Sequence, residues 1–195
     1  MEAQQKTGAV EGEYYLRGVM ETASGFKLNP DASFEFFFSY GALDRSGTGT
    51  WEKKDNRVVF NSPPAKGQNF ALVKNKMIND ENITIKIVDS NPNFLPYVYG
   101  IVKSGAQTLE AVTDKNGEIR FAKQPVDSIV LMFEFAPERA AIFAFNNPTD
   151  NYFEFRFEPW ILDVVFEDLT LRLDGKDLKG PHPLLKEGEY HFIKN

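Results

Sequence analysis

Hydrophobic and polar residues alternate along much of this chain. Between residues 33 and 40, Phe34, Phe36 and Phe38 occupy every second position, and Glu35 and Ser39 stand between them. A period of two puts successive side chains on opposite faces, as in a β-strand with one buried face. The same alternation predicts strands at 14–21, 83–87, 129–135, 152–158 and 169–173.

Turn-forming residues separate these segments and indicate which strands follow one another in hairpins. Pro30 and Asp31 favour a turn before the strand at 33–40. The run Asp114–Gly117 is typical of a tight hairpin turn. Three hairpins are therefore expected, which pair 25–28 with 33–40, 48–53 with 57–61, and 109–113 with 118–121.

Two stretches depart from simple alternation. Pro137 to Phe145 has a proline at its start that could begin a short helix, but Phe143 and Phe145 alternate, which favours a strand. Val164 is out of phase with Leu169, and one extra residue near Glu167 would restore the register. We therefore expect a β-bulge there.

No segment sustains a period of 3.6 residues, and short strands with turns between them predict an all-β protein. We expect an antiparallel meander or small open barrel followed by a β-sandwich. Pro63 and Pro64 cannot donate to a strand ladder and should interrupt any sheet. The boundary is placed near Asn79, with domains at 1–78 and 79–195.

Two stretches contain residues in patterns that known families share. They are Gly12, Tyr14, Leu16, Gly18, Leu28, Pro30, Asp31, Phe34, 40–44 and 49–51 in the first stretch, and Gly100, Val102, Thr113, Asp114, Gly117, Phe121 and Ile129 in the second. The first stretch resembles small bacterial lipocalin-like or meander modules, and the second a transthyretin-like or carboxypeptidase-regulatory-like sandwich. The resemblance implies a bacterial two-domain all-β protein of unknown function, of a kind that is often exported, and it implies no catalytic residue.

Composition narrows the chemistry. The 195 residues include no Cys, which excludes disulfides, thiol catalysis and thiolate metal sites. The net charge of −6 makes nucleic acid an unsuitable partner. There are only two His residues, and no phosphate-binding loop or nucleophile elbow occurs. No cofactor and no metal are expected.

Targeting signals are sparse. Residues 1–10 contain no apolar stretch, so we expect no signal peptide in this sequence, and nothing later approaches ~18 consecutive apolar residues. The family resemblance favours a periplasmic or secreted protein whose signal peptide was removed before Met1. The alternative is a cytoplasmic protein.

Titratable residues offer few candidates for catalysis. His182 lies between two prolines, which predicts an exposed loop, and His191 is expected on the surface of the last strand. The run Asp114–Gly117 lacks the spacing of a calcium loop, so a plain turn is the better interpretation. The acidic residues near the end could serve glycoside hydrolysis or form a solvated surface. They are Glu158, Asp163, Glu167 and Asp168.

The aromatic content supplies the remaining candidates, since 18 Phe, seven Tyr and two Trp exceed what one core stripe needs. Exposed aromatics mark binding surfaces, whereas buried ones pack the core. In the segment 40–51 we expect Asp44 to cap the turn and Trp51 to pack beneath it, with its N–H bonded if buried. The candidate binding residues are Tyr40, Asp44, Trp51, Tyr97 and Tyr99.

Three hypotheses for function follow. The first is a non-enzymatic binding or scaffold module with an unknown protein or glycan partner. The second is a hydrolase that acts on a polysaccharide with paired carboxylates, which requires two carboxylates at the base of a cleft. The third is a lipocalin-like carrier of an apolar small molecule, although about five strands are too few to close around a ligand.

Overall fold

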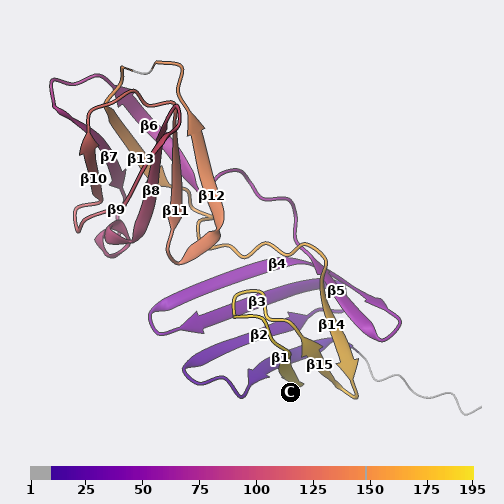
Figure 1. Ribbon diagram of the computed structural model, residues 1–195. Helices are drawn as coiled ribbons and strands as arrows, with labels where there is room; N and C mark the ends of the chain where they lie inside the picture. The colour runs from indigo at the N-terminus through magenta and orange to yellow at the C-terminus, as the bar shows by residue number, and fades with distance from the viewer. Residues whose placement is uncertain (1–9, 148) are drawn as a thin grey trace, which may run out of the picture. The chain divides into compact units, whose positions relative to one another are not determined.

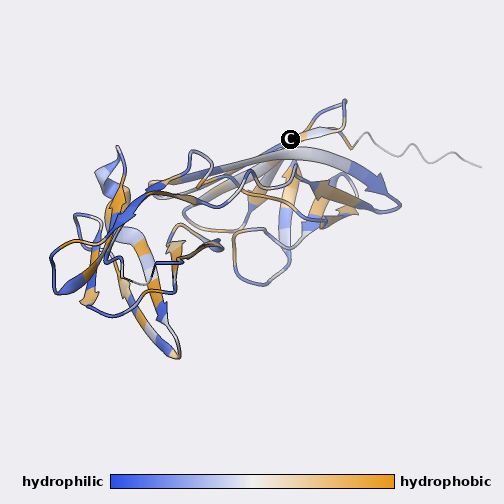
Figure 2. Cartoon of the chain, turned by 90° about the horizontal axis from the view of Figure 1, so that it is seen from above, coloured by the Kyte–Doolittle hydropathy of each residue, from blue (hydrophilic) through white to orange (hydrophobic). Residues whose placement is uncertain are grey.

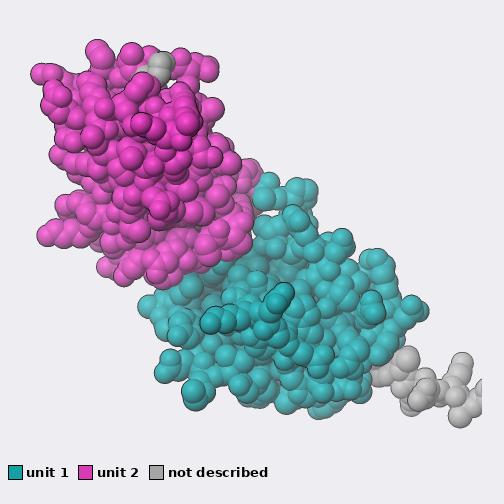
Figure 3. All heavy atoms as spheres, in the orientation of Figure 1, with its two compact units in different colours: residues 1–65, 162–195 teal, residues 66–161 magenta. Residues whose placement is uncertain are grey.

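The computed structural model describes residues 10–147 and 149–195, and it confirms the all-β class (Figure 1). Within this part of the chain the only helical segment is the short 3-10 helix η1 (Pro92–Tyr97). The chain forms two compact units (Figure 3). The barrel unit consists of the chain up to Ala65 together with Leu162–Asn195, and the sandwich unit is Lys66–Ile161.

In the barrel unit, eight strands of the described chain close into an antiparallel barrel. Strands from the two ends of the sequence meet at two places and close the barrel, because β1 pairs with β16 and β5 pairs with β14. In order around the barrel they are β1 (Gly12–Arg17), β16 (Tyr190–Lys194), β15 (Asp177–Gly180), β14 (Leu169–Asp174), β5 (Arg57–Asn61), β4 (Leu43–Lys54), β3 (Ser33–Tyr40) and β2 (Thr22–Leu28).

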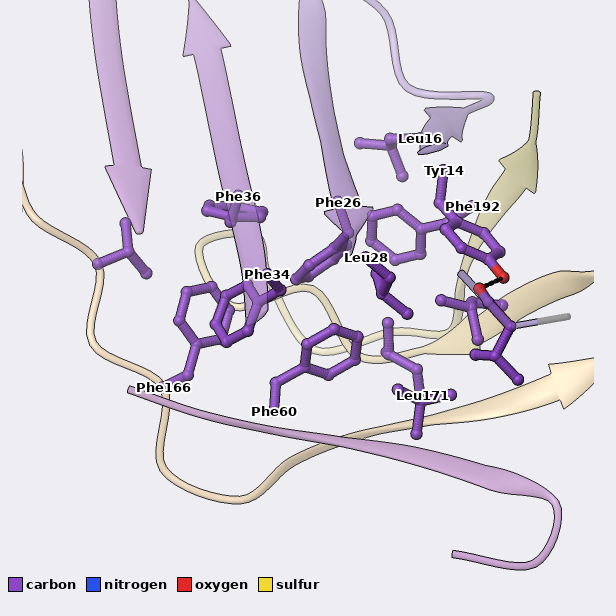
Figure 4. Packing of buried hydrophobic residues seen from close by; sticks show 14 of the residues in the cluster. Tyr14, Leu16, Phe26, Leu28, Phe34, Phe36, Phe60, Phe166, Leu171 and Phe192 are labelled. Carbon is purple, nitrogen blue, oxygen red and sulfur yellow. Dashed lines mark hydrogen bonds between the residues drawn. The ribbon is translucent and has the colours of Figure 1, made fainter. Parts of the chain in front are cut away.

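Phenylalanine rings fill the barrel. Phe26 lies 4.7 Å from Phe60 and 5.2 Å from Phe192, measured between ring centroids. Most of these ring pairs are tilted or edge-to-face, the arrangements that aromatic pairs prefer. The alternation seen on β3 in the sequence is the reason, since every second residue points inward. Figure 4 shows the cluster, which includes Tyr14, Leu16, Phe26, Leu28, Phe34, Phe36, Phe60, Phe166, Leu171 and Phe192.

Small residues on β4 make room for this packing. Gly47 lies opposite Phe36 and Gly49 lies opposite Phe34. A Cβ added at Gly47 would come within 2.6 Å of the ring of Phe166, and one at Gly49 within 2.8 Å of Phe34. Small residues facing large ones are a usual device for filling a small barrel.

Phe166 reaches the core from the segment that leads into β14. Its ring lies 5.1 Å from both Phe34 and Phe36. The segment is fixed to β4, because the Val164 N–H donates to the Ser46 carbonyl at 2.7 Å. Buried Arg45 adds a bond from Nε to the Leu162 carbonyl at 3.2 Å.

The sandwich unit contains two sheets, each of four strands in the described residues. Neighbouring strands are antiparallel except β7 and β13, which are parallel. The first sheet runs β10 (Glu118–Ala122), β7 (Asn82–Val88), β13 (Tyr152–Phe157), β6 (Phe70–Lys76). The second runs β12 (Ala136–Ala144), β11 (Ser128–Phe133), β8 (Val98–Ser104), β9 (Gln107–Val112).

The core of the sandwich unit comes from alternate residues of both sheets. Ile83, Ile85 and Ile87 of β7 are fully buried, as are Phe153 and Phe155 of β13. Residues between them point outward. Figure 2 shows this alternation as changing colour along the strands.

The boundary predicted near Asn79 differs from the observed division. The chain leaves the barrel unit at Ala65, builds the sandwich unit, and returns at Leu162. Strands β14, β15 and β16 therefore belong to the barrel rather than to a second consecutive domain. The expected open meander of five strands is completed to a closed barrel by residues more than 100 positions later, and such pairing leaves no local mark in the sequence. The interruption expected at Pro63 and Pro64 does fall between strands.

The hairpin predicted across 109–121 is wrong, although its turn is real. Asp114 accepts hydrogen bonds from the amides of Asn116 (2.8 Å) and Glu118 (2.9 Å), and Gly117 adopts a φ of 76°. However, β9 pairs with β8, and β10 pairs with β7 in the other sheet. The turn therefore carries the chain between the two sheets.

Three further predictions concern the bounds and regularity of single strands. The stretch 137–145 is a strand, as favoured. The leading strand ends at Arg17 rather than at residue 21. No β-bulge forms near Glu167. A bend with Asp168 at a φ of 52° changes the phase before β14 instead.

We expect Phe166→Ala to destabilise the barrel unit by about 3–5 kcal/mol, because it removes a ring at the centre of the core and leaves a cavity. Trp51 lies in the barrel unit and Trp160 in the sandwich unit, so urea unfolding followed by fluorescence in a Trp160→Phe background reports the barrel. The control is Tyr40→Ala, which removes an aromatic ring that is 52% exposed. Equal destabilisation by the two variants would show that Phe166 is not a core residue.

Candidate functional site

Tyr40 and Asp44 flank the β3–β4 hairpin. Tyr40 pairs with Leu43 across a turn in which Gly41 has a φ of 58°. Tyr40 is 52% exposed. The described residues show no hydrogen bond accepted by the Asp44 carboxylate, so the expected cap is not formed and this turn depends on Gly41.

Trp51 lies far from that hairpin, toward the other end of β4. Its indole Nε1 donates to the Asn29 carbonyl at 3.1 Å, and its backbone N–H donates to the Ala32 carbonyl at 2.8 Å. The ring also packs against the barrel core. The expectation that its N–H is bonded is therefore confirmed, but Trp51 holds the β2–β3 turn rather than the segment 40–44.

Tyr97 and Tyr99 lie in the sandwich unit. The ring of Tyr97, at the end of η1, packs 4.8 Å from that of Phe135. Tyr99 is on the outward side of β8, and its hydroxyl donates to the Glu110 carboxylate. The five predicted candidates thus occupy three separate places, and Tyr99 alone leads to a larger surface.

That surface is the outward side of the sheet β12-β11-β8-β9. Directly paired residues in antiparallel strands share a face. Tyr99 pairs with Val112 on one side and Met132 on the other, and Ile101 pairs with Glu110 and Val130. Val130 pairs in turn with Ile142. We call this surface the apolar sheet face, and it comprises Tyr99, Ile101, Val112, Val130, Met132 and Ile142.

Every residue of the apolar sheet face is at least partly exposed to solvent. Val112 is 53% exposed and Ile142 is 61% exposed. Six neighbouring apolar side chains on one sheet differ from the scattered exposed hydrophobics of ordinary surfaces, because they are contiguous. The sequence signal was present in β8 and β11, since the positions between the inward ones, such as Ile101 and Val130, are also apolar.

The outward side of the other sheet is charged. Lys74 pairs with Glu154 at 3.0 Å, and Lys86 with Glu118 at 3.2 Å. Two lysine ammonium groups also lie within 6 Å of the Tyr152 ring. This is the expected composition of a solvated sheet face. The sandwich unit therefore has one charged, well-solvated outer face and one outer face with a contiguous apolar surface.

A second surface lies on the barrel wall, where Phe37 and Tyr15 flank Gly25 with ring centroids 6.1 Å apart. An adjoining hollow has a volume of about 480 Å³. Its charged groups bond to one another, since Lys27 pairs with Glu35 at 3.2 Å. A Cβ at Gly25 would meet the Phe37 ring at 2.9 Å, so these aromatics shield a glycine, a known way of supporting a sheet.

His182 is a buried group inside the barrel, only 5% exposed. Its Nδ1 accepts from the Leu184 N–H at 3.1 Å. The proton is therefore on Nε2, which lies 3.0 Å from the Ser24 hydroxyl. That hydroxyl donates to the Phe37 carbonyl at 2.9 Å, so a neutral imidazole satisfies every group in the chain of bonds.

The prediction that His182 lies in an exposed loop is wrong. Its ring stacks on Phe192 with an interplanar angle of 12°, and the Tyr190 ring lies 5.7 Å away. Burial lowers the pKa of His182 to about 4, since desolvation disfavours the imidazolium. The sequence signal was the pair Leu184 and Leu185, which pack against the core and draw the loop inward. His191 is partly exposed, as expected, and pairs with Asp177 at 3.2 Å.

The acidic residues considered for hydrolysis are distributed over both units. Glu158 lies in the sandwich unit and pairs with Arg156 at 3.0 Å. Asp168 lies in the barrel unit and accepts from the Asn61 side chain at 3.0 Å. Across residues 10–147 and 149–195, no group of three or more His, Asp and Glu is placed to hold a metal ion. The same residues include no helix with the length and apolar character of a membrane span.

No family model, curated protein or solved structure matches this chain. The lipocalin-like and transthyretin-like resemblances therefore stay predictions. The geometry of the chain itself must support any assignment of function.

We expect Asp44→Ala to change the free energy of unfolding by less than about 0.5 kcal/mol, as for a surface residue without partners. Asp114→Ala is the matched comparison, because hydrogen bonds from the amides of Glu118 and Asn116 lower the pKa of Asp114. Asp114→Ala should lower the melting temperature measurably more. A larger loss of stability in Asp44→Ala would show that Asp44 caps the turn as the sequence predicts.

The buried imidazole should make stability depend on pH. The pKa of His182 is about 4 in the folded chain and about 6.5 when unfolded, so the unfolded chain binds the proton first as pH falls. Its contribution is complete above about pH 6.5 and is lost progressively toward pH 4, by up to about 3 kcal/mol.

His182→Gln isolates this contribution from the carboxylates that titrate in the same range. Urea unfolding of both proteins should show a stability difference at pH 7 that shrinks as pH falls to 4. A difference that stays constant over this range would mean that His182 is not held neutral.

Proposed function

We propose that this chain is a non-enzymatic binding module whose apolar sheet face docks a partner protein. The single observation that carries the proposal is the contrast between the two outer faces of one sandwich. Lysine, arginine and glutamate side chains cover one of them. Aliphatic and aromatic side chains form the centre of the other, with Glu110 and Lys103 beside them. Their exposure costs free energy that a partner would recover.

The size of the face favours a partner protein over a second copy. Four strands ~4.8 Å apart and about six residues of ~3.4 Å span roughly 400 Å². Stable complexes bury about 800 Å² on each partner. A symmetric pair that used this face alone would be weak, whereas a partner that also contacts the margins would bury enough surface.

A glycan is a less suitable occupant. Sugar rings stack on exposed aromatic rings and bond to polar groups around them. Tyr99 is the one aromatic residue of the apolar sheet face, and its hydroxyl already donates to Glu110. Aliphatic side chains such as Ile142 and Val112 offer a sugar no hydrogen bond, but they suit the apolar centre of a protein interface.

The other two hypotheses lose support. A carrier needs an empty apolar interior, whereas phenylalanine rings occupy the centre of the barrel. A hydrolase needs two carboxylates at the base of one cleft, whereas Glu158 already pairs with Arg156 and Asp168 accepts from Asn61.

The test is site-specific photo-crosslinking in the cells that naturally produce the protein. A benzoylphenylalanine at position 142 should give one discrete adduct with another protein. The same group at position 120, exposed on the charged face, should give none. Ile101→Lys should abolish the adduct from position 142, with folding checked by tryptophan fluorescence.

Two results would contradict the proposal. Equal adducts from positions 120 and 142 would show nonspecific contact. An adduct that survives Ile101→Lys would show that the centre of the apolar sheet face takes no part.

A further inference from the structure

β9 is an edge strand with unused hydrogen-bonding groups. Its two-residue hairpin with β8 makes Ser104 and Gln107 a hydrogen-bonded pair, and such pairs alternate along an antiparallel ladder. The bond from the Thr113 N–H to the Val98 carbonyl at 2.9 Å continues that pattern. The backbone groups that must then point away from β8 are those of Thr108, Glu110 and Val112. Outside the strand ladders, the backbone groups of these three residues make no hydrogen bond to another backbone group in the described chain.

Two other edge strands of the sandwich unit, β12 and β6, carry features that block strand addition. On β12, the Ile142 N–H donates to the Gln68 side chain at 2.5 Å, and Arg139 donates to the Gly67 carbonyl at 3.1 Å. β6 carries Lys74 and a register shift against β13. Lysines, irregular register and covering segments are the usual protections of an edge. β9 has no proline, no lysine and no register shift.

We propose that β9 receives an extended segment of a partner protein as a fifth, antiparallel strand. The proposal rests on the proposed function, since the added strand would continue the apolar sheet face. Addition to an exposed edge is an established mode of peptide recognition, in which backbone bonds supply affinity and alternate side chains supply specificity.

The side chains of β9 define the chemistry of that segment. Residues directly opposite one another share a face. A basic residue therefore belongs opposite Glu110, and an aliphatic residue opposite Val112 extends the row that contains Tyr99 and Met132. Leu109 and Ala111 point inward and are only partly buried, so the intervening positions of the segment should also be apolar.

A second copy of this chain fits the edge less well. Antiparallel pairing of β9 with its own copy through the outward backbone groups of Thr108, Glu110 and Val112 on both chains places Glu110 opposite Glu110. Like charges directly opposite destabilise a strand pair. The occupant is thus a different chain with a basic residue at this position.

The probe is the blocked synthetic peptide Gly-Ser-Val-Val-Lys-Val-Thr-Ser-Gly, titrated into the ¹⁵N-labelled full chain. Binding should shift the amide signals of Thr108, Glu110 and Val112 and slow their hydrogen exchange at least tenfold. A peptide with Glu in place of Lys should bind at least tenfold more weakly. Glu110→Lys should reverse this preference.

Thr108→Pro supplies the matched control, since the N–H that it removes points away from β8. It should abolish peptide binding and leave the amide signals of β8 unchanged, whereas Thr108→Val should bind as the natural chain does. Edge positions whose N–H faces outward tolerate proline.

Several outcomes would overturn the strand addition. They are no saturable shift at the three amides, equal binding of the two peptides, or a dimer in sedimentation that Thr108→Pro dissociates, which would make a second copy the occupant. The proposed function is tested separately. Crosslinks from position 142 that persist in Thr108→Pro would support the docking face and contradict the strand addition. Peptide binding without crosslinks from position 142 would support the strand addition and contradict the docking face.

Discussion

Two strand pairs, β5 with β14 and β6 with β13, constrain the rest of the molecule. In the barrel unit the outgoing strand ends at Asn61 and the returning strand begins at Leu169, beside Phe60. In the sandwich unit the incoming strand begins at Phe70, which pairs with Phe157 at the end of the returning strand. In each unit, the point where the chain leaves and the point where it returns therefore lie side by side. The sandwich unit can be inserted at such a point without opening the barrel.

Hydrogen bonds continue both strand pairs beyond their ends, toward the segments that connect the two units. The Asp168 N–H donates to the Asn61 side chain at 2.8 Å in the barrel unit. In the sandwich unit the Glu158 N–H donates to the Asn69 carbonyl at 3.0 Å. Because β14 to β16 must wait until the sandwich sequence has been made, the barrel depends on contacts of long sequence separation. Such contacts slow folding through the entropy of loop closure.

The same constraint explains which expectations the sequence could support. Period-two alternation located most of the strands, since it reflects a local rule about which face is buried. Asp114 located its turn equally well, because its hydrogen bonds to Asn116 and Glu118 are local. No comparable local rule indicates which strands pair with one another. The hairpin across 109–121 and the boundary near Asn79 both failed because they assumed that neighbours in sequence are neighbours in a sheet.

The predicted positions of two single side chains were wrong for a related reason. The sequence predicts that Trp51 packs beneath the nearby segment 40–44. Because β4 is 12 residues long, Trp51 lies instead at the β2–β3 turn, where the Asn29 carbonyl accepts its indole N–H. His182 was assigned to the surface by its flanking prolines, but the adjacent leucines decide its position. In each case a long-range contact outweighed a correct local observation.

The filled barrel restricts where recognition can occur. With rings such as those of Phe26 and Phe166 in contact at its centre, the barrel interior offers a ligand no space. In the proposed function, specificity therefore comes from a surface. On the sandwich unit, Glu110 lies at the margin of the apolar sheet face and next to an open strand edge.

One carboxylate in that position serves two purposes. A continuous apolar face beside an unprotected edge would favour self-association into extended sheets. Glu110 opposes this, because each added copy would bring another carboxylate toward it, and the net charge of −6 acts in the same direction. In the proposed strand addition, the same charge attracts a basic residue of the partner. A residue that opposes pairing with identical chains and favours oppositely charged ones would let the proposed docking face stay exposed until its partner binds.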